Sequence, residues 1–241
     1  MFNIARALCV ASAAMLPLAA VAQTPAPTIK ITGSGGFVTD YTFRGVSQTG
    51  NKPAVQGNLE ASAEVGPVTP YLGLWGSNVR FNSANLELDA TGGLRGEFKG
   101  FAWDVGAIYY NYPGSDSNLN YNFWEFQAKV GYDFKVVNPS IAVNYSPDMF
   151  GKSGKAWYIQ ANADIPLPMD FVLSGHIGRQ TVDNNVAFAL PDYTDWSIGI
   201  SREILGLTVS LAYVDTNITK SECGGLTTCD ARAVLSVFKK F

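Results

Sequence analysis

The sequence predicts an all-β protein in which one antiparallel sheet closes into a transmembrane barrel of about twelve strands. Three observations indicate this class. Apolar and polar residues alternate with a period of two over most of the chain. Only 15% of residues are charged, yet beyond the N-terminal segment no stretch is apolar over the roughly 20 residues of a helical span. Short and long polar breaks alternate between these runs, as short periplasmic turns and longer external loops do in membrane barrels.

The N-terminal segment has the features of a secretory signal peptide. Arg6 is its only charged residue, an apolar run follows, and Ala20-Val21-Ala22 is a small-residue cleavage site. The apolar run is too short for a retained transmembrane helix, and Pro17 interrupts it. We therefore expect cleavage after Ala22 and export. The predicted organisation is a signal peptide at 1–22, a loose N-terminal extension at 23–28 and a transmembrane β-barrel at 29–241.

Charge and composition exclude several partners. The whole chain has 17 Lys and Arg against 20 Asp and Glu, and loss of Arg6 with the signal peptide changes the net charge from −3 to −4. An acidic chain without basic aromatic clusters is a poor partner for nucleic acid. Glycine-rich phosphate loops after strands are also missing from the pattern. We expect neither a nucleic-acid partner nor a cofactor.

The first alternating run begins at Ile29. Its odd positions carry mainly Ile, Gly, Phe and Tyr, and its even positions carry mainly Lys, Thr, Ser, Asp and Arg. Successive side chains of a strand point to opposite faces, so the odd positions should face lipid and the even ones the lumen. On this pattern Tyr41 and Phe43 belong to an outer aromatic girdle, and Asp40 and Arg44 point inward.

Eleven similar runs follow, joined by two classes of connection. Tight breaks near residues 66, 99, 135, 167 and 205 alternate with polar links at 47–53, 80–84, 113–120, 148–154, 182–191 and 218–229. Short turns should lie on the periplasmic side and the longer links outside. The predicted strands are 29–46, 54–65, 68–79, 85–98, 101–112, 121–134, 139–147, 155–165, 170–181, 192–204, 206–217 and 230–241.

The last strand ends in an aromatic residue, Phe241, at the same parity as Leu235 and Val237. Such an end resembles the signal by which the outer-membrane assembly machinery recognises its clients. We therefore expect that machinery and outer-membrane lipid as partners, and the cell outer membrane as the location. Lys239 interrupts the apolar face, and we expect it to snorkel to the interface, since a charge at the bilayer midplane costs roughly 2–4 kcal/mol.

Charged residues at the inner parity are the candidates for function. Buried charges must be paired or hydrated, so these groups indicate either a plug of ion pairs or a water-filled path. Acidic groups outnumber basic ones, and carboxylates favour cations, so an open path would prefer cations or small neutral solutes. The candidates for the lumen and its constriction are Asp40, Arg44, Glu60, Glu87, Asp89, Arg95, Asp104, Glu125, Lys129 and His176.

Within this set, Asp40 and Arg44 share one face of the first predicted strand, and Glu60 lies on the next. These three side chains are expected to form part of a constriction, or alternatively a structural cluster that holds the first hairpin closed. The pattern alone does not separate the two.

Several stretches resemble the TorF-family porins of Gram-negative bacteria. They are Val38–Thr49, Asn51–Gly57, Gly73–Asn78, Tyr109–Gly114 and Tyr145–Asp148, which occur in the order of the family and cover nearly the whole mature chain. The resemblance implies an outer-membrane barrel suspected of passive transport. It implies no established substrate and no catalytic residues.

Two cysteines, Cys223 and Cys229, lie in the last external link. In an oxidising compartment a close, even pair predicts a disulfide that pins the loop. A zinc site needs about four ligands, and His176 is the sole histidine, so no metal site is expected.

Three function classes remain. The first is a porin-like channel for small solutes or ions, and the second a non-conducting structural or binding barrel. A hydrolase is the remote third, because barrel hydrolases use His with Ser or Asp near the external rim, whereas His176 and Ser174 lie halfway along a strand. We expect no enzyme.

Overall fold

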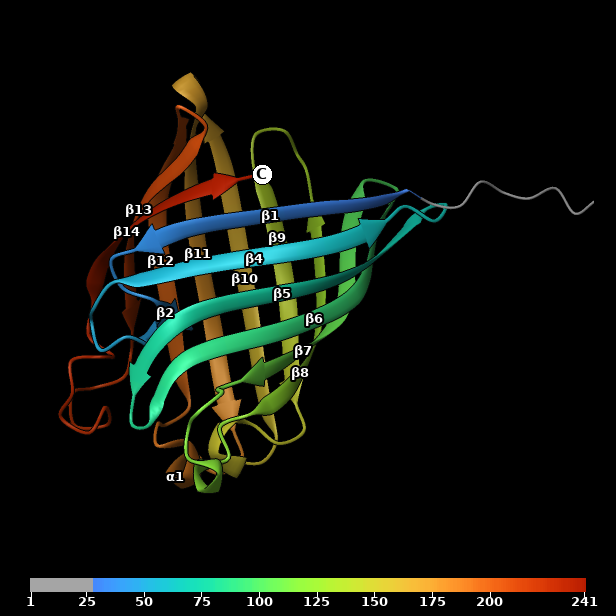
Figure 1. Cartoon of the computed structure of the whole chain (residues 1–241). Coiled ribbons are helices and arrows are strands. Elements are labelled where there is room, and N and C mark those ends of the chain that lie inside the picture. The colour runs from blue at the N-terminus through green and yellow to red at the C-terminus, as the bar shows by residue number, and fades with distance from the viewer. Residues whose placement is uncertain (1–27) are drawn as a thin grey trace, which may run out of the picture.

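The computed structural model describes residues 28–241 and shows a closed antiparallel β-barrel of twelve strands, which confirms the predicted fold class (Figure 1). Strand neighbours in the barrel follow sequence order, and the first strand pairs with the last. The expected signal peptide (1–22) and nearly all of the expected extension (23–28) lie outside the described residues. The barrel strands are β1 (Ile29–Val38), β4 (Ala54–Ala63), β5 (Val68–Phe81), β6 (Ala84–Phe98), β7 (Phe101–Asn111), β8 (Phe123–Tyr132), β9 (Asn138–Ser146), β10 (Ala156–Leu167), β11 (Phe171–Val182), β12 (Tyr193–Ile204), β13 (Leu207–Thr216) and β14 (Arg232–Lys240).

Closure joins β1 to β14 along a short seam. The register runs from Ser34 opposite Lys240 to Val38 opposite Ser236. Beyond the last strand, Phe241 continues the ladder, because its N–H and C=O both bond to Gly33 at 3.0 Å. The other edge of β1 pairs with β4 over its full length. The barrel sheet of residues 28–241 thus closes on itself, which is the condition for a sheet surrounded by lipid.

The two faces of the sheet differ as the alternation predicts. Large apolar side chains such as Leu72, Leu74, Ile159 and Leu211 are exposed on the outside. Polar and charged side chains such as Glu125 are buried on the inside. A sheet that is apolar outside and polar inside suits a lipid surround, since in water the arrangement would be reversed.

The connections differ between the two ends of the barrel (Figure 1). At one end the strands are joined by tight turns such as Leu205-Gly206, where both residues have positive φ, 53° and 72°. The Lys239 ammonium donates to the carbonyl of Gly206 at 3.0 Å, so this lysine reaches the turn end of the barrel. At the other end the links are longer, except that Asn82 and Ser83 alone join β5 to β6 where a link over 80–84 was expected.

The first predicted strand is wrong beyond Val38. Residues 39–53, here called the lumen loop, leave the wall and fold into the barrel, where β2 (Thr42–Phe43) and β3 (Val46–Ser47) form a small hairpin. Tyr41 and Phe43 therefore lie inside the barrel instead of in a lipid-facing girdle. Their rings pack against Trp75 and Tyr110, at centroid distances of 5.2 and 5.7 Å.

The long links gather into a cap over the end of the barrel, here called the crown (residues 112–122, 147–155, 183–192 and 217–231). It carries three short helices, η1 (Ser117–Leu119), η2 (Phe150–Lys152) and α1 (Asn185–Phe188), and another, η3 (Pro168–Asp170), lies in a turn at the opposite end. No helix within residues 28–241 is long and apolar enough to cross a membrane.

Aromatic packing holds the crown together. The rings of Tyr121 and Phe150 stack at 4.2 Å, and Phe81 meets Tyr112 edge-on at 5.6 Å. The predicted disulfide between Cys223 and Cys229 is present and buried in the last link. These contacts close much of the loop end with side chains.

Substitution of lipid-facing residues should show which surface is in the membrane. Ile198 lies in the middle of β12 and is 56% exposed, while Val186 in α1 is 93% exposed. Ile198→Arg should destabilise the barrel by about 2–4 kcal/mol in lipid vesicles, since it puts a charge near the midplane. Val186→Arg, in the crown, should change the unfolding midpoint little. Equal tolerance of both in urea unfolding would contradict a membrane-facing exterior.

Candidate functional site

The lumen loop crosses the barrel interior by means of a two-residue hairpin turn. Arg44 and Gly45 both have positive φ, 49° and 80°, as a tight hairpin of the primed type requires. A Cβ on Gly45 would lie 2.5 Å from Thr216 Cγ2 and 2.8 Å from Asp195 Cβ. The tip therefore abuts the wall formed by β12 and β13, and only glycine fits there.

Arg44 ties this tip to the wall at β8 and β11. Its Nη2 donates to both carboxylate oxygens of Glu125, at 2.6 and 2.8 Å, and its Nη1 donates to Gln180 Oε1 at 2.6 Å. The guanidinium also lies 4.1 Å from the centroid of the Tyr158 ring. Side-chain exposure is 6% for Arg44 and 1% for Glu125, so this is a buried ion pair.

The Arg44 charge is maintained in spite of burial. Burial acts to lower the pKa of Arg44, but the Glu125 carboxylate and the Tyr110 and Tyr193 side chains together outweigh it, and the pKa is raised. Glu125 accepts a further hydrogen bond from the Tyr110 hydroxyl at 3.1 Å. The pair is thus almost fully hydrogen-bonded, which a buried ion pair needs in order to offset desolvation.

Asp40 anchors the base of the same loop. Its carboxylate accepts from Ser47 Oγ at 2.6 Å and Thr49 Oγ1 at 2.7 Å, both within the lumen loop. Its other oxygen accepts from Arg232 Nη1, at the start of β14, at 2.8 Å. Arg232 also donates to the carbonyl of Thr228 in the disulfide link. One arginine therefore connects the lumen loop, the last strand and the crown.

Two acidic residues on β6 lie behind the lumen loop. Glu87 accepts from the Tyr41 hydroxyl at 3.2 Å. Burial first, and then the Glu87 carboxylate, raise the pKa of Tyr41 well above its usual value, so this hydroxyl remains a donor. Glu87 Oε2 and Asp89 Oδ1 are buried without a hydrogen-bond partner among residues 28–241.

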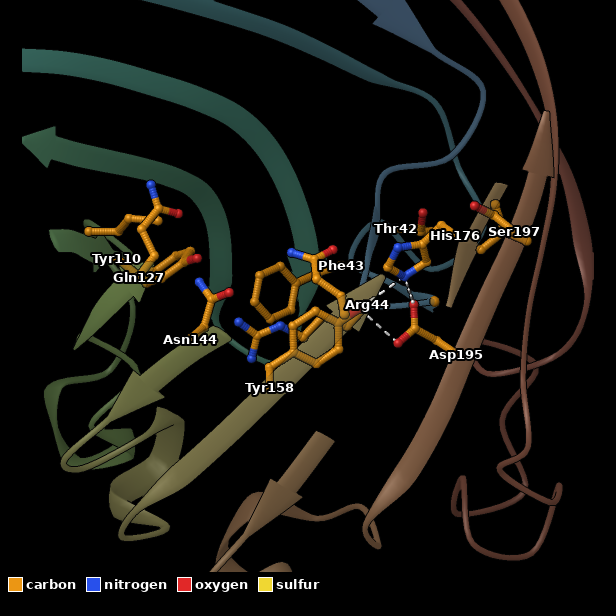
Figure 2. A pocket seen from close by; sticks show the side chains of 14 residues that line it. Thr42, Phe43, Arg44, Tyr110, Gln127, Asn144, Tyr158, His176, Asp195 and Ser197 are labelled. Atoms are coloured by element: carbon orange, nitrogen blue, oxygen red, sulfur yellow. Dashed lines mark hydrogen bonds and ion pairs between the residues drawn. The ribbon is translucent and has the colours of Figure 1, made fainter. Parts of the chain in front are cut away.

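His176 belongs to a polar cluster beside the Arg44 clamp, as Figure 2 shows. Its Nε2 lies 2.8 Å from Asp195 Oδ2 and its Nδ1 lies 2.8 Å from Asn162 Oδ1. The Tyr158 hydroxyl donates to Asp195 Oδ1 at 2.9 Å. Ser174 donates instead to Asp164, at 2.6 Å, so Ser174 is not the hydrogen-bond partner of His176.

These groups surround a central chamber of about 390 Å³ between the lumen loop and the wall. Figure 2 shows His176, Asp195 and Ser197 on one side of Arg44, and Asn144 and Gln127 on the other. Most of the lining is polar. The chamber can therefore hold water and small polar solutes next to one arginine and one histidine.

A second cavity, the vestibule, opens at the turn end and has a volume of about 1060 Å³. Arg95, Asp104 and Lys129 line it. Arg95 also forms an ion pair with Glu60, with a closest approach of 2.5 Å. Asp104 also accepts from the Tyr71 hydroxyl at 2.8 Å. This cavity is larger than the chamber beside the lumen loop.

The expected cluster of Asp40, Arg44 and Glu60 does not form. Asp40 binds Arg232, Arg44 binds Glu125, and Glu60 reaches over β5 to Arg95 on β6. Asp40 and Arg44 were predicted on the first barrel strand. They lie instead in the lumen loop, because β1 ends at Val38. The remaining candidates divide between the space behind the lumen loop (Glu87, Asp89), the Arg44 clamp (Glu125), the chamber (His176) and the vestibule (Arg95, Asp104, Lys129).

Sequence reasoning missed several partners in these clusters. Asp195 and Arg232 have inward parity on β12 and β14, so the alternation could have found both. Gln180 and Tyr158 also have inward positions, but uncharged side chains carry no signal that separates them from ordinary lumen residues. In residues 28–241 no three His, Cys, Asp or Glu side chains are grouped so as to hold a metal ion.

A sequence model described as a bacterial protein of unknown function, Gcw_chp, matches residues 22–241. The chain belongs to the Gcw_chp family. No curated protein is similar to it in sequence.

Solved structures similar to this Gcw_chp barrel include a KdgM porin in complex with disordered oligogalacturonate. That likeness has a TM-score of 0.54 at 9% identity and covers 88% of this chain and 99% of the porin. A structure from a study of in-meso crystallisation of membrane proteins has a TM-score of 0.53 at 7% identity. The likeness covers 87% of this chain and 83% of the other. An outer-membrane channel from Pseudomonas putida F1 has a TM-score of 0.48 at 10% identity, and the likeness covers 94% of this chain and 100% of the channel. The KdgM likeness indicates that the Gcw_chp chain has the fold of an outer-membrane porin.

The buried Arg44 clamp should dominate the stability of the lumen loop. Arg44→Ala leaves Glu125 buried without its cation and should cost about 3–5 kcal/mol in urea unfolding. The double variant Arg44→Ala with Glu125→Leu should recover part of that loss, since it removes both charges. Lys135→Ala, in an exposed ion pair with Asp133, serves as the control and should leave the midpoint unchanged. Additive losses in the double variant would contradict direct coupling.

Proposed function

We propose that this protein is a porin-like outer-membrane channel through which small solutes or ions diffuse passively along a narrow, acid-rich lumen. The observation that carries the proposal is a closed cylinder with an apolar exterior and a polar interior, in which the chamber and the vestibule leave room for solutes. The porin fold and the resemblance to the TorF-family porins support the same function.

The lumen loop would act as the constriction. Arg44 extends from its tip to β8 and β11, so a solute that passes from chamber to crown must pass beside this guanidinium. Carboxylates dominate the surroundings, namely Glu87, Asp89, Glu125 and Asp195, with Arg44 as the nearest fixed cation. Carboxylate-rich linings favour cations, so the channel should select cations or small neutral solutes.

The export route belongs to the same proposal. A signal peptide cleaved after Ala22 would deliver the chain to the periplasm. Phe241, which extends β14 and pairs with Gly33, would serve as the assembly signal and then complete the seam. The bilayer lipid would cover the exposed apolar side chains of the strands.

A non-conducting barrel is the second candidate, and the crown favours it. Tyr112, Tyr121 and Phe150 pack over the loop end, and this cluster must leave open or admit a path if solutes are to enter. Liposome swelling with a series of small sugars and ions separates the two candidates. Permeation that depends on solute size supports the channel. Liposomes that contain the folded barrel but admit no solute support the structural role.

Single-channel recording tests the constriction. Arg44→Ala should increase the conductance and shift selectivity toward cations, because it removes both bulk and positive charge from the proposed constriction. Arg179→Ala, on the outer face of β11, is the matched control and should leave both quantities unchanged. Wild-type conductance and selectivity in the Arg44→Ala channel would remove Arg44 from the conduction path.

A further inference from the structure

Four uncharged polar side chains line the central chamber without a hydrogen-bond partner. They come from the lumen loop (Thr42), β9 (Asn144), β10 (Gln160) and β12 (Ser197). Their amide and hydroxyl groups form no hydrogen bond with any residue of the described chain 28–241. Asn144 is only 6% exposed, and a polar side chain buried to this degree is normally hydrogen-bonded. These groups therefore leave donors and acceptors for a molecule inside the chamber.

The four side chains lie around the cavity and not on one wall. Asn144 on β9 pairs in register with Tyr158 on β10, whose side chain also lines the chamber. Figure 2 shows Asn144 on one side of Arg44, with Thr42 and Ser197 on the other. A solute in the chamber can thus be held from several directions, which fixes its orientation.

The charged side chains of the chamber wall already have partners. Arg44 donates to the Glu125 carboxylate, as described above. Asp195 accepts from the Tyr158 hydroxyl at Oδ1, and its Oδ2 lies 2.8 Å from His176 Nε2. Neither an anion nor a cation meets an unpaired opposite charge among these groups. What the chamber offers to a solute is neutral hydrogen-bonding capacity.

We propose that the chamber binds a small neutral polyol with the chemistry of a monosaccharide. Each sugar hydroxyl both donates and accepts hydrogen bonds, and so do the amides and hydroxyls of the wall. An inorganic cation would use only the oxygens and would leave the amide N–H groups of Asn144 and Gln160 unpaired. Phe43, Ile108 and Val214 provide apolar surface for the carbon-bound hydrogens of the sugar ring.

The size of the chamber fits such a ligand. Its volume of about 390 Å³ lies within the roughly 300–1,000 Å³ of small-molecule sites. The assignment rests on the proposed channel, because it names the class of solute that the lumen would admit. Binding itself requires only that the sugar reaches the chamber, and not that it crosses the barrel. Binding and conduction can therefore be tested separately.

Saturation-transfer difference NMR with D-glucose tests the site, with the full mature barrel in lipid nanodiscs and empty nanodiscs as the blank. D-glucosamine and D-glucuronate serve as matched sugars of positive and negative charge. We expect a saturable signal from glucose and weaker binding of both charged sugars. The charged group of each would lose hydration in the chamber without gaining an unpaired partner.

Two variants test the amides. Asn144→Leu and Gln160→Leu each replace an amide by an apolar side chain of similar size, and each should weaken glucose binding about two- to tenfold. Gln56→Leu changes an amide on β4 that bonds to Ser77 Oγ and lies outside the chamber, so it should bind glucose like the wild type. Circular dichroism checks that each barrel is folded, and the second amide variant retains the test if the first does not fold.

The results separate this site from the channel. A glucose signal no greater than that of empty nanodiscs would overturn the site, whatever liposome swelling shows. Equal binding of the three sugars, or wild-type affinity in both amide variants, would overturn the assignment to a neutral polyol. Glucose binding that is weakened by both variants, in a barrel that admits no solute into liposomes, would support the site and contradict only the channel.

Discussion

Backbone hydrogen bonding is the constraint on which this architecture depends. A sheet surrounded by lipid cannot leave N–H and C=O groups unpaired, because each unpaired group costs several kcal/mol there. The chain satisfies the constraint by pairing β1 with β14 and by extending that pairing to Phe241 and Gly33. Once the cylinder is closed, every strand has one face toward lipid and one toward the lumen, and the placement of charge inside follows.

The lumen is divided into compartments of different chemistry. The vestibule is wide and holds charges of both signs, and the chamber is smaller and polar. Above them the crown is aromatic. The lumen loop lies between the chamber and the crown and is anchored at two points, by Arg44 on β8 and by Asp40 on β14. Because both anchors are ion pairs between largely buried side chains, the loop is a fixed part of the interior between these compartments.

Most of the fold could be predicted from the sequence because lipid and water impose a strict period of two. The strand predicted at 85–98 is observed at Ala84–Phe98, and the one predicted at 192–204 at Tyr193–Ile204. The first strand failed for a physical reason. Its alternation continues through Tyr41 and Phe43, and a local pattern cannot tell whether an apolar ring meets lipid or another ring inside the barrel.

The length of that predicted strand was a usable warning. A run of 18 residues is far longer than the roughly 9–11 that cross a bilayer, and Gly45 follows Arg44 as in a tight turn. The candidate residues were less predictable than the strands. Inward parity placed Glu60, Arg95 and Glu125 on the inner face, but their pairing depends on how strands stagger around the cylinder and on which groups the lumen loop brings in. A local sequence pattern predicts neither the strand stagger nor the contacts of the lumen loop.

The contact between Asp40 and Arg232 has a consequence for the order of assembly. The two residues are 192 positions apart, near opposite ends of the barrel sequence. The hairpin of Arg44 and Gly45 also rests against β12 and β13, which are synthesised late. Contacts between such distant segments carry a large loop-closure entropy unless the intervening chain is already ordered. We therefore expect the lumen loop to take its final position late in assembly, after the last strand has docked.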